Sequence, residues 1–294
     1  MRIRRPTVGW LALAPLALAA ACASTGTLSR FDAFAQAGSA YAKAVDALLQ
    51  QAAQIQVDAS SEKLLSTRDD FGPVSRADFE KQDQADRAFI HEITLLRRQA
   101  KLLADYFSAL DALATSDQPQ AFGASLAATA GSLDALSQQL RGRPLAKSVQ
   151  AAQVLAADVG SLVVRRAESR ALQHELEQRK ATIARVLQLH VALLGAVRDQ
   201  VEANLEFARN RDYEQQVEDP YLTTGAPLDE NGWKQSRFKG LEPPDPVQQL
   251  DAAQSAAREL QTAWAKLLTH ELGPGDLQAV TGELTPILAA LDNL

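Results

Sequence analysis

The feature that most constrains this chain is a spacing of apolar residues that alternates steps of three and four over long stretches. One series runs from Phe31 to Ile55, and a second runs from Phe89 to Ala114. Residues at this spacing share one stripe of an α-helix. A stripe that repeats over several heptads is the packing seam of a helical bundle or a coiled coil. The sequence therefore predicts long amphipathic helices that pack side by side.

The same spacing covers most of the remaining chain. Breaker residues at 69–73 separate the first two predicted helices, and Ser75 is placed to cap the second. Further apolar series begin at Phe122, Leu145, Leu172, Val247 and Leu277. Aromatic residues make up only 5% of the chain, and β-branched runs are scarce, which disfavours sheet. We expect an all-α fold, an elongated antiparallel helical bundle built on three long helices with shorter ones alongside.

The N-terminus has the three-part order of a secretory signal. A basic segment at residues 2–5 is followed by an apolar stretch at 8–18, and then by three alanines and Cys22. The apolar stretch is well short of the roughly 20 residues that a membrane-spanning helix needs. Small residues that end directly at a cysteine resemble the lipobox of bacterial lipoproteins, with Ala19 at a position where that class most often has leucine.

The lipoprotein resemblance implies a division of the chain into three parts. Residues 1–21 are the signal peptide. Residues 22–27 are a flexible tether that is lipidated on Cys22, and residues 28–294 are the helical domain. Ala23 rather than aspartate follows the cysteine, which in Gram-negative members of the class implies transport to the outer membrane. We therefore expect a lipid-anchored protein of the cell envelope, at the outer membrane and facing the periplasm. The alternatives are an uncleaved membrane anchor and an ordinary signal peptide that is cut nearby.

Charge limits the partners that this chain can have. It contains 30 basic and 36 acidic residues, a net charge of −6. Removal of residues 1–21 takes away three arginines and leaves 27 basic against 36 acidic residues, a balance of −9. A negative surface repels phosphate backbones, so we expect no nucleic-acid partner. The expected partners are the membrane, through the lipid anchor, and an envelope protein.

Residue types that often perform catalysis are present, but without the spacing that catalysis requires. None of the four histidines has a second histidine four residues away, and no Glu-x-x-His pair occurs, so the zinc-protease and di-iron patterns are absent from the sequence. The Gly-x-Ser-x-Gly motif and the phosphate-binding loop motif are absent too. We predict a protein that is not an enzyme and that holds no cofactor and no metal.

Polar residues interrupt two of the apolar stripes. His190 and Asn204 lie on the stripe of the longest predicted helix. A buried polar residue in such a seam typically fixes the register or meets a partner across the interface. Gln82 and Asp86 occupy seam positions just before the second series. They indicate either a partner or ion site at one end of the bundle, or a solvated helix end that outruns its neighbours.

Residues 217–246 have no helical periodicity and are rich in proline and glycine, which predicts an irregular loop. The segment holds several of the few aromatic residues, and aromatic and arginine side chains are typical of interface hot spots. The candidate partner-binding residues are Tyr221, Trp233, Arg237 and Phe238. In the alternative, these rings fold back and cap the bundle. The dipeptide at 231–232, Asn-Gly, is suited to turn a small hairpin.

Two functions fit these features. The favoured one is a non-enzymatic envelope lipoprotein that acts as an adaptor, spacer or assembly factor by binding a protein partner. The other is a membrane-acting helical bundle of the pore-forming or lipid-handling type, which rearranges its long helices to expose their apolar faces. The chain after residue 21 has no strongly apolar hairpin of spanning length, which disfavours the second function.

Overall fold

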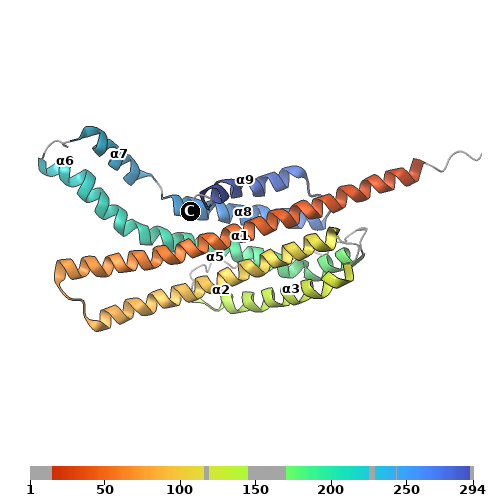
Figure 1. Cartoon of the computed structure of the whole chain (residues 1–294), viewed down its shortest axis with the longest axis horizontal. Coiled ribbons are helices and arrows are strands. Elements are labelled where there is room, and N and C mark those ends of the chain that lie inside the picture. Colours follow the sequence, from red (N-terminus) through yellow and green to blue (C-terminus); the bar gives the residue numbers. More distant parts are fainter. Residues whose placement is uncertain (1–14, 116–118, 145–169, 225–228, 243, 292–294) are drawn as a thin grey trace, which may run out of the picture.

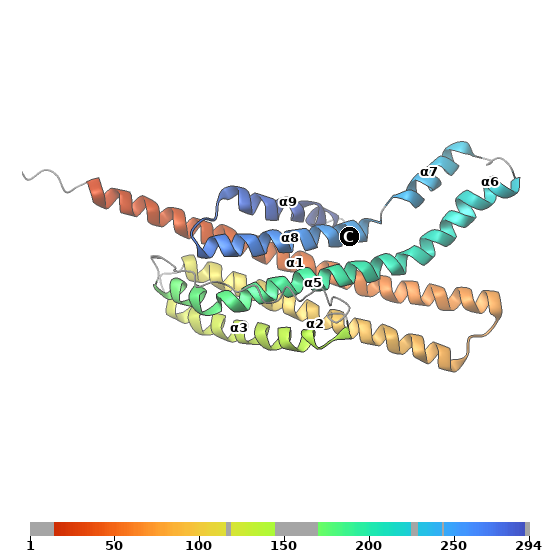
Figure 2. The ribbon, with the colours of Figure 1, turned by 180° about the vertical axis from the view of Figure 1, so that it is seen from behind.

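Long helices that run side by side make up the structure, a computed structural model that describes residues 15–115, 119–144, 170–224, 229–242 and 244–291. Over these ranges the chain has no strand. The longer helices are α1 (Pro15–Phe71), α2 (Arg76–Thr115), α3 (Pro119–Arg141), α5 (Arg170–Tyr213), α8 (Asp245–Leu268) and α9 (Pro274–Leu291). The all-α helical bundle predicted from the apolar spacing is confirmed (Figure 1, Figure 2). The start of the series predicted from Leu145 lies outside the described residues.

Three long helices set the length of the molecule. α1 has 57 residues, α5 has 44 and α2 has 40, which correspond to about 85, 66 and 60 Å at a rise of about 1.5 Å per residue. α1 and α2 form an antiparallel hairpin. Its turn contains Gly72 with a φ of 86°, a left-handed conformation that favours glycine. Ser75 caps α2 as predicted, because its Oγ accepts a hydrogen bond from the backbone N–H of Asp78 at 3.1 Å.

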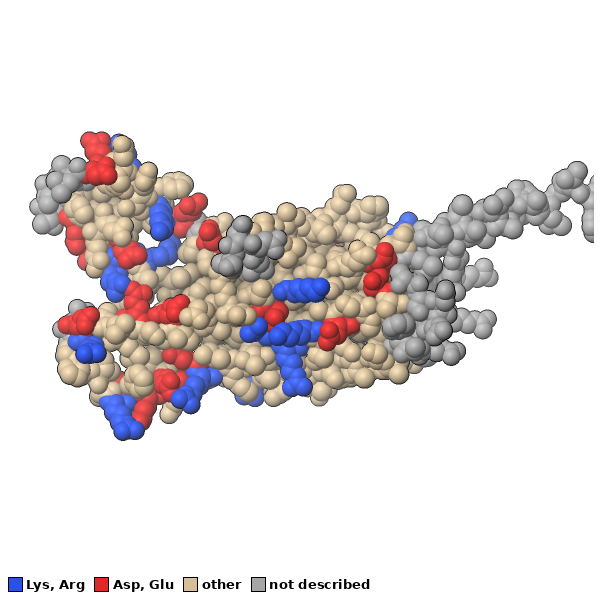
Figure 3. Space-filling view, viewed as in Figure 1, with Lys and Arg blue, Asp and Glu red and all other residues tan. Residues whose placement is uncertain are grey.

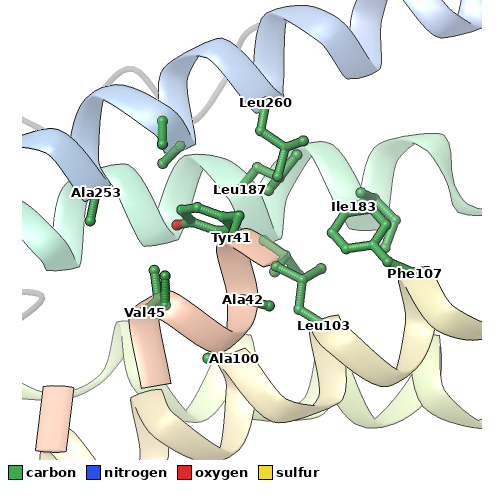
Figure 4. Packing of buried hydrophobic residues seen from close by; sticks show 14 of the residues in the cluster. Tyr41, Ala42, Val45, Ala100, Leu103, Phe107, Ile183, Leu187, Ala253 and Leu260 are labelled. Carbon is green, nitrogen blue, oxygen red and sulfur yellow. The ribbon is translucent and has the colours of Figure 1, made fainter. Parts of the chain in front are cut away.

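The predicted stripes of α1, α2, α5 and α8 meet in one apolar core. Figure 4 shows buried side chains at its centre, among them Tyr41, Val45, Leu103, Phe107, Ile183, Leu187 and Leu260. The centroid of the Phe34 ring lies 5.5 Å from that of Phe107 and 5.6 Å from that of Trp264, so this ring joins α1 to α2 and α8. A Cβ atom at Gly38 would lie 2.5 Å from the Phe107 ring. Glycine at this position therefore allows the close approach of α1 and α2.

His190 is buried in this core and pairs across a helix interface. Its Nδ1 lies 3.1 Å from the hydroxyl oxygen of Tyr41, a contact that joins α5 to α1. Burial lowers the pKa of His190 from 6.5 to about 4, because the protonated ring would lose its hydration. The interpretation of His190 as a seam residue that meets a partner across the interface is confirmed, and its ring is neutral at neutral pH.

The flexible tether expected at residues 22–27 is helical in the structure. α1 begins at Pro15 and continues through this segment to Phe71 without a break. The physical reason is that no proline occurs between residues 16 and 71, so the backbone hydrogen bonds of the helix continue past the first turn.

The prediction of an irregular loop at residues 217–246 is wrong, because most of this segment is helical. It contains the end of the π-helical turn η2 (Glu214–Glu218), then α6 (Asp219–Thr224), α7 (Glu230–Leu241) and the start of α8. Pro246 is the second residue of α8, where a missing N–H costs no helical hydrogen bond. Pro220 follows η2 inside a continuous helix, so its missing N–H removes one helical hydrogen bond beside the π-helical turn. The carboxylate of Asp229 caps α7 by accepting from the backbone N–H of Asn231 at 3.0 Å. The dipeptide at 231–232 therefore lies in a helical turn, and the predicted hairpin is wrong.

The molecule divides into a body and a fork (Figure 1). In the body, α1, α2, α3, α5, α8 and α9 pack together around the apolar core. The fork has two prongs that leave the body at the same end: the hairpin prong, residues 57–88, and the arm, residues 205–242 (Figure 1, Figure 2). The N-terminal part of α1 projects from the opposite end of the body.

Candidate partner-binding site

Large apolar side chains that face solvent are concentrated in the fork. Those of the hairpin prong are Val57, Leu65 and Phe79, and those of the arm are Phe207, Tyr221, Leu222, Phe238 and Leu241. Within the described residues, Leu288 of the body is the one other large apolar side chain that is comparably exposed. Single exposed apolar residues are ordinary, but a concentration of them on one part of a surface marks an interaction site. The fork is therefore the candidate binding site.

Three of the four residues predicted to bind a partner form one cluster on the arm. The rings of Tyr221 and Trp233 stack with centroids 5.7 Å apart, and the Arg237 guanidinium lies 5.6 Å from the centroid of the Trp233 ring. The indole N–H of Trp233 donates to the carbonyl oxygen of Val217 at 3.0 Å. These contacts hold α7 against η2 and α6. The cluster is part of the arm, and its rings do not cap the body.

Phe238, the fourth of these residues, belongs to a separate apolar face. Its side chain is 68% exposed, and that of Leu241 is 65% exposed. The two residues are three positions apart on α7, so they share one side of the helix. α7 has no buried residue, and its apolar face is left uncovered by the described chain.

The base of the arm is fixed by contacts that the sequence analysis did not predict. A Cβ atom at Gly240 would lie 2.4 Å from the Tyr213 ring, so glycine lets α7 pack directly on the end of α5. The Arg209 guanidinium donates to the carbonyl oxygens of Gly240 at 2.8 Å and Glu242 at 3.0 Å. Carbonyl groups at a helix C-terminus lack partners within the helix, and a cation there also interacts favourably with the helix dipole. Arg209 therefore caps the C-terminal end of α7 and links it to α5.

A cavity of about 350 Å³ lies at the same place, between α5, α7 and the start of α8. Its apolar walls are Leu205, Tyr213, Pro244 and Pro246. Its polar lining consists of Arg209, Asp212, Gln216, Ser236, Lys239, Glu242 and Asp245. The volume is at the lower end of the range for small-molecule sites, about 300–1,000 Å³. Charges of both signs line the cavity, so they select no single class of ligand.

A polar layer crosses the bundle where the fork begins. The Asp86 carboxylate accepts hydrogen bonds from Gln56 Nε2 at 2.8 Å, from Ser60 Oγ at 2.7 Å and from Gln82 Nε2 at 3.1 Å. The side-chain oxygen of Gln56 in turn accepts from Asn204 Nδ2 at 2.7 Å, so the layer joins α1, α2 and α5. Groups that are bonded in this way avoid the penalty of burying an unpaired polar atom.

The layer explains the polar seam positions found in the sequence. Gln82 and Asp86 were predicted to form either a partner or ion site or a solvated helix end. The structure shows both partly buried, with Asp86 bonded to α1 and Gln82 bonded to Asp86 within α2. No group of three or more potential metal-ligating residues occurs in the part of the chain that the structure describes. Gln56 and Ser60 were missed, although they continue the α1 stripe from Ala52 at steps of four.

One ion pair links the two prongs directly. Arg211 of the arm pairs with Glu62 of the hairpin prong, and both side chains are about one-third exposed. Ion pairs with this degree of exposure contribute little to stability. The prongs are therefore joined firmly at the polar layer and weakly beyond it.

Comparisons with known proteins give no family for this chain. No model of a protein family, no curated protein and no solved structure matches it. Cys22, the predicted lipidation site, lies in the helical backbone near the start of α1. Its acylation stays a prediction.

Proposed function

We propose that this protein is a lipid-anchored adaptor of the bacterial cell envelope that binds a protein partner through the fork. The observation that carries the proposal is the concentration of solvent-exposed apolar side chains on the two prongs. A partner that covers these side chains gains about 25 cal/mol for each Å² of apolar surface removed from water. The proposal assigns no catalytic step, cofactor or metal to the chain.

The length of α1 supports a spacer role. Cys22 is near the start of this helix, and Phe71 is its last residue. About 50 residues of unbroken helix separate them by about 75 Å. A lipid on Cys22 would therefore hold the tips of the fork well away from the anchoring membrane. This separation fits a protein that presents a binding site at a distance from its anchor.

The alternative, a membrane-acting bundle, has less support. Among the described helices, the continuous helix Glu175–Leu222 is the one that has the length and apolar composition of a membrane span. Many of its apolar side chains, such as Ile183 and Val197, are fully buried in the body. Exposing a side chain of this size costs about 1.5–3 kcal/mol. Insertion of this helix into a bilayer would therefore dismantle the body.

Crosslinking in intact cells tests the adaptor. A photoreactive amino acid that replaces Phe238, on the uncovered face of α7, should yield a discrete adduct with one protein. The matched control places the same amino acid at Ala135, an exposed residue of α3 in the body, and should yield no such adduct. The same adduct from both positions would refute a binding site in the fork. No adduct from Phe238 and none from Phe79 of the other prong would refute it too.

The anchor is tested separately by mass spectrometry. The mature chain should begin at Cys22 and carry fatty acyl groups. Cys22→Ser should abolish both the acyl mass and the cleavage before residue 22, because the sulfur atom is the acceptor for the lipid. A native chain that keeps residues 1–21, or one that lacks acyl mass, contradicts the lipid anchor.

A further inference from the structure

The two prongs of the fork carry most of the net charge of the chain. The hairpin prong and the arm each contain eight acidic and five basic residues, so each has a net charge of −3. Together they account for −6 of the −9 that remains after residue 21. Two projections of like charge repel each other, and a cationic partner between them removes that repulsion.

Many carboxylates of the arm have no cation of their own. Five exposed ones form no ion pair with any residue that the structure describes: Glu206, Asp212, Glu214, Glu218 and Asp219. Four of the five basic residues of the arm are engaged elsewhere, among them Lys234, which pairs with Glu230, while Lys239 forms no ion pair with any residue that the structure describes. Arg209 bonds to backbone carbonyl oxygens, Arg211 pairs with Glu62, and Arg237 lies over the Trp233 ring. The arm therefore presents negative charge that its own residues leave uncompensated.

The exposed apolar side chains lie on the same two prongs. Phe238 and Leu241 form the uncovered face of α7, and Leu65 and Phe79 are exposed on the hairpin prong. Figure 3 shows the arm and the end of the hairpin prong as separate projections with charged side chains on both. Exposed apolar side chains on two prongs that each carry a net charge of −3 complement a helix that has one apolar face and lysine or arginine on the other.

We infer that the fork binds a cationic amphipathic helix of a protein partner. The apolar face of that helix lies against the exposed side chains of the prongs, and its lysine or arginine side chains lie against the carboxylates. This inference rests on the proposed adaptor function and names the chemistry of the partner. An anionic membrane surface is a poorer occupant, because it has the same sign of charge as the fork.

A binding experiment with the full acylated chain in neutral detergent tests the inference. The probe is a fluorescent synthetic peptide of about 20 residues, a helix of about 30 Å, built from leucine and lysine with all leucines on one face. One control peptide has glutamate in place of lysine. A second has the leucine and lysine composition of the probe in an order that gives no apolar face.

Two triple variants distinguish binding of the probe at the fork from a general effect of the net charge of the protein. Asp212→Asn, Glu214→Gln and Glu218→Gln remove three uncompensated charges from the arm. Asp105→Asn, Glu259→Gln and Glu283→Gln remove three from the body and change the net charge by the same amount. At low salt, we expect the arm variant to bind the probe about tenfold more weakly and the body variant to bind less than about twofold more weakly. The difference should shrink at high salt.

Several results would overturn the inference. The inference fails if both triple variants bind the probe equally weakly. It fails if the glutamate peptide, or the peptide without an apolar face, binds as tightly as the probe. It also fails if the probe does not bind at all. Phe238→Ser with Leu241→Ser should weaken binding of the probe. If that double variant instead loses affinity for phosphatidylcholine vesicles and keeps it for the probe, the apolar face binds a bilayer and the inference fails. A crosslinked protein at Phe238 without probe binding would leave the adaptor proposal standing and refute the cationic helix alone.

Discussion

In the body, α1 and α2 are covered by neighbours on several sides, whereas in the fork the same two helices pack mainly on each other. Tyr41 and Leu103 are fully buried in the body, but Leu65 and Phe79 of the hairpin prong are more than half exposed. Apolar burial stabilises the body, and a polar layer, helix caps and a few ring contacts stabilise the fork. α1 and α2 are therefore part of the packed core where other helices cover them, and candidate binding elements where no other helix covers them.

Truncation of a phenylalanine in each region gives the sharpest test of this contrast. Phe107→Ala removes a fully buried ring that packs against α1, and we expect it to lower the free energy of unfolding by about 3–5 kcal/mol. Phe79→Ala removes an exposed ring of the hairpin prong and should change that free energy by less than about 0.5 kcal/mol. Chemical denaturation followed by circular dichroism measures both. Losses of similar size would contradict the distinction between body and fork.

The pH dependence of stability probes the body through His190. The pKa of this residue is 6.5 when unfolded and about 4 when folded, so between these values the unfolded chain binds a proton that the folded chain does not. The contribution of neutral His190 to the free energy of unfolding is fully present above about pH 6.5 and is lost as the pH falls. The loss of stability approaches roughly 3 kcal/mol near pH 4.

The measurement compares denaturation at about pH 7 and about pH 4.5 in the native chain and in His190→Leu. The variant should lose less stability over this interval, because the group that titrates is gone. The other acidic groups titrate in both proteins, so their effects cancel in the comparison. Equal losses would show that His190 is not buried in its neutral form.

The boundary between the two regions is tested at Asp86. Asp86→Ala leaves Gln56 Nε2 and Ser60 Oγ without their acceptor, and we expect it to lower the free energy of unfolding by about 1–3 kcal/mol. Asp86→Asn keeps one acceptor oxygen and should cost less. Hydrogen exchange should accelerate in the hairpin prong more than in α3 or α9. Uniform acceleration over the whole chain would argue against a boundary at this layer.

The smallest effect is expected where the prongs meet in solvent. Glu62→Gln removes the ion pair with Arg211, in which both side chains are partly exposed. We expect a change of about 0.2–1 kcal/mol in the free energy of unfolding, decreasing as salt is added. Thermal melts at low and high salt measure it. A loss as large as that of Phe107→Ala would mean that the fork is held together by charge and is more rigid than we infer.

The helices of the body could be predicted from the sequence, because each carries an apolar stripe that the core requires. The series from Phe31 and from Phe89 coincide with the buried residues of α1 and α2. The arm could not be predicted in the same way. α7 buries none of its residues, so no core requires a long apolar stripe along it, and it depends on the cap at Asp229 and on the contacts of Trp233.

The candidate site was predicted in part. Tyr221, Trp233 and Arg237 were selected from the sequence by residue type, and the structure brings them together in one cluster. Their role in binding stays a prediction. The sequence identified Asp86 as a polar residue that interrupts an apolar stripe, but it did not predict the contact of Asp86 with Gln56. The spacing within one helix does not encode the register between two helices. The contribution of the hairpin prong was missed, because exposure of Phe79 depends on where the neighbouring helices end.

Because the hairpin prong packs mainly on itself, its reach is independent of the rest of the fold. Insertion of seven residues into each of its two helices beside the Gly72 turn would preserve the phase of both stripes and carry the tip outward by about 10 Å. Insertion of two residues in each would instead rotate the tip about its axis. Homologous chains that serve partners at other distances are therefore expected to differ in length here by multiples of a heptad.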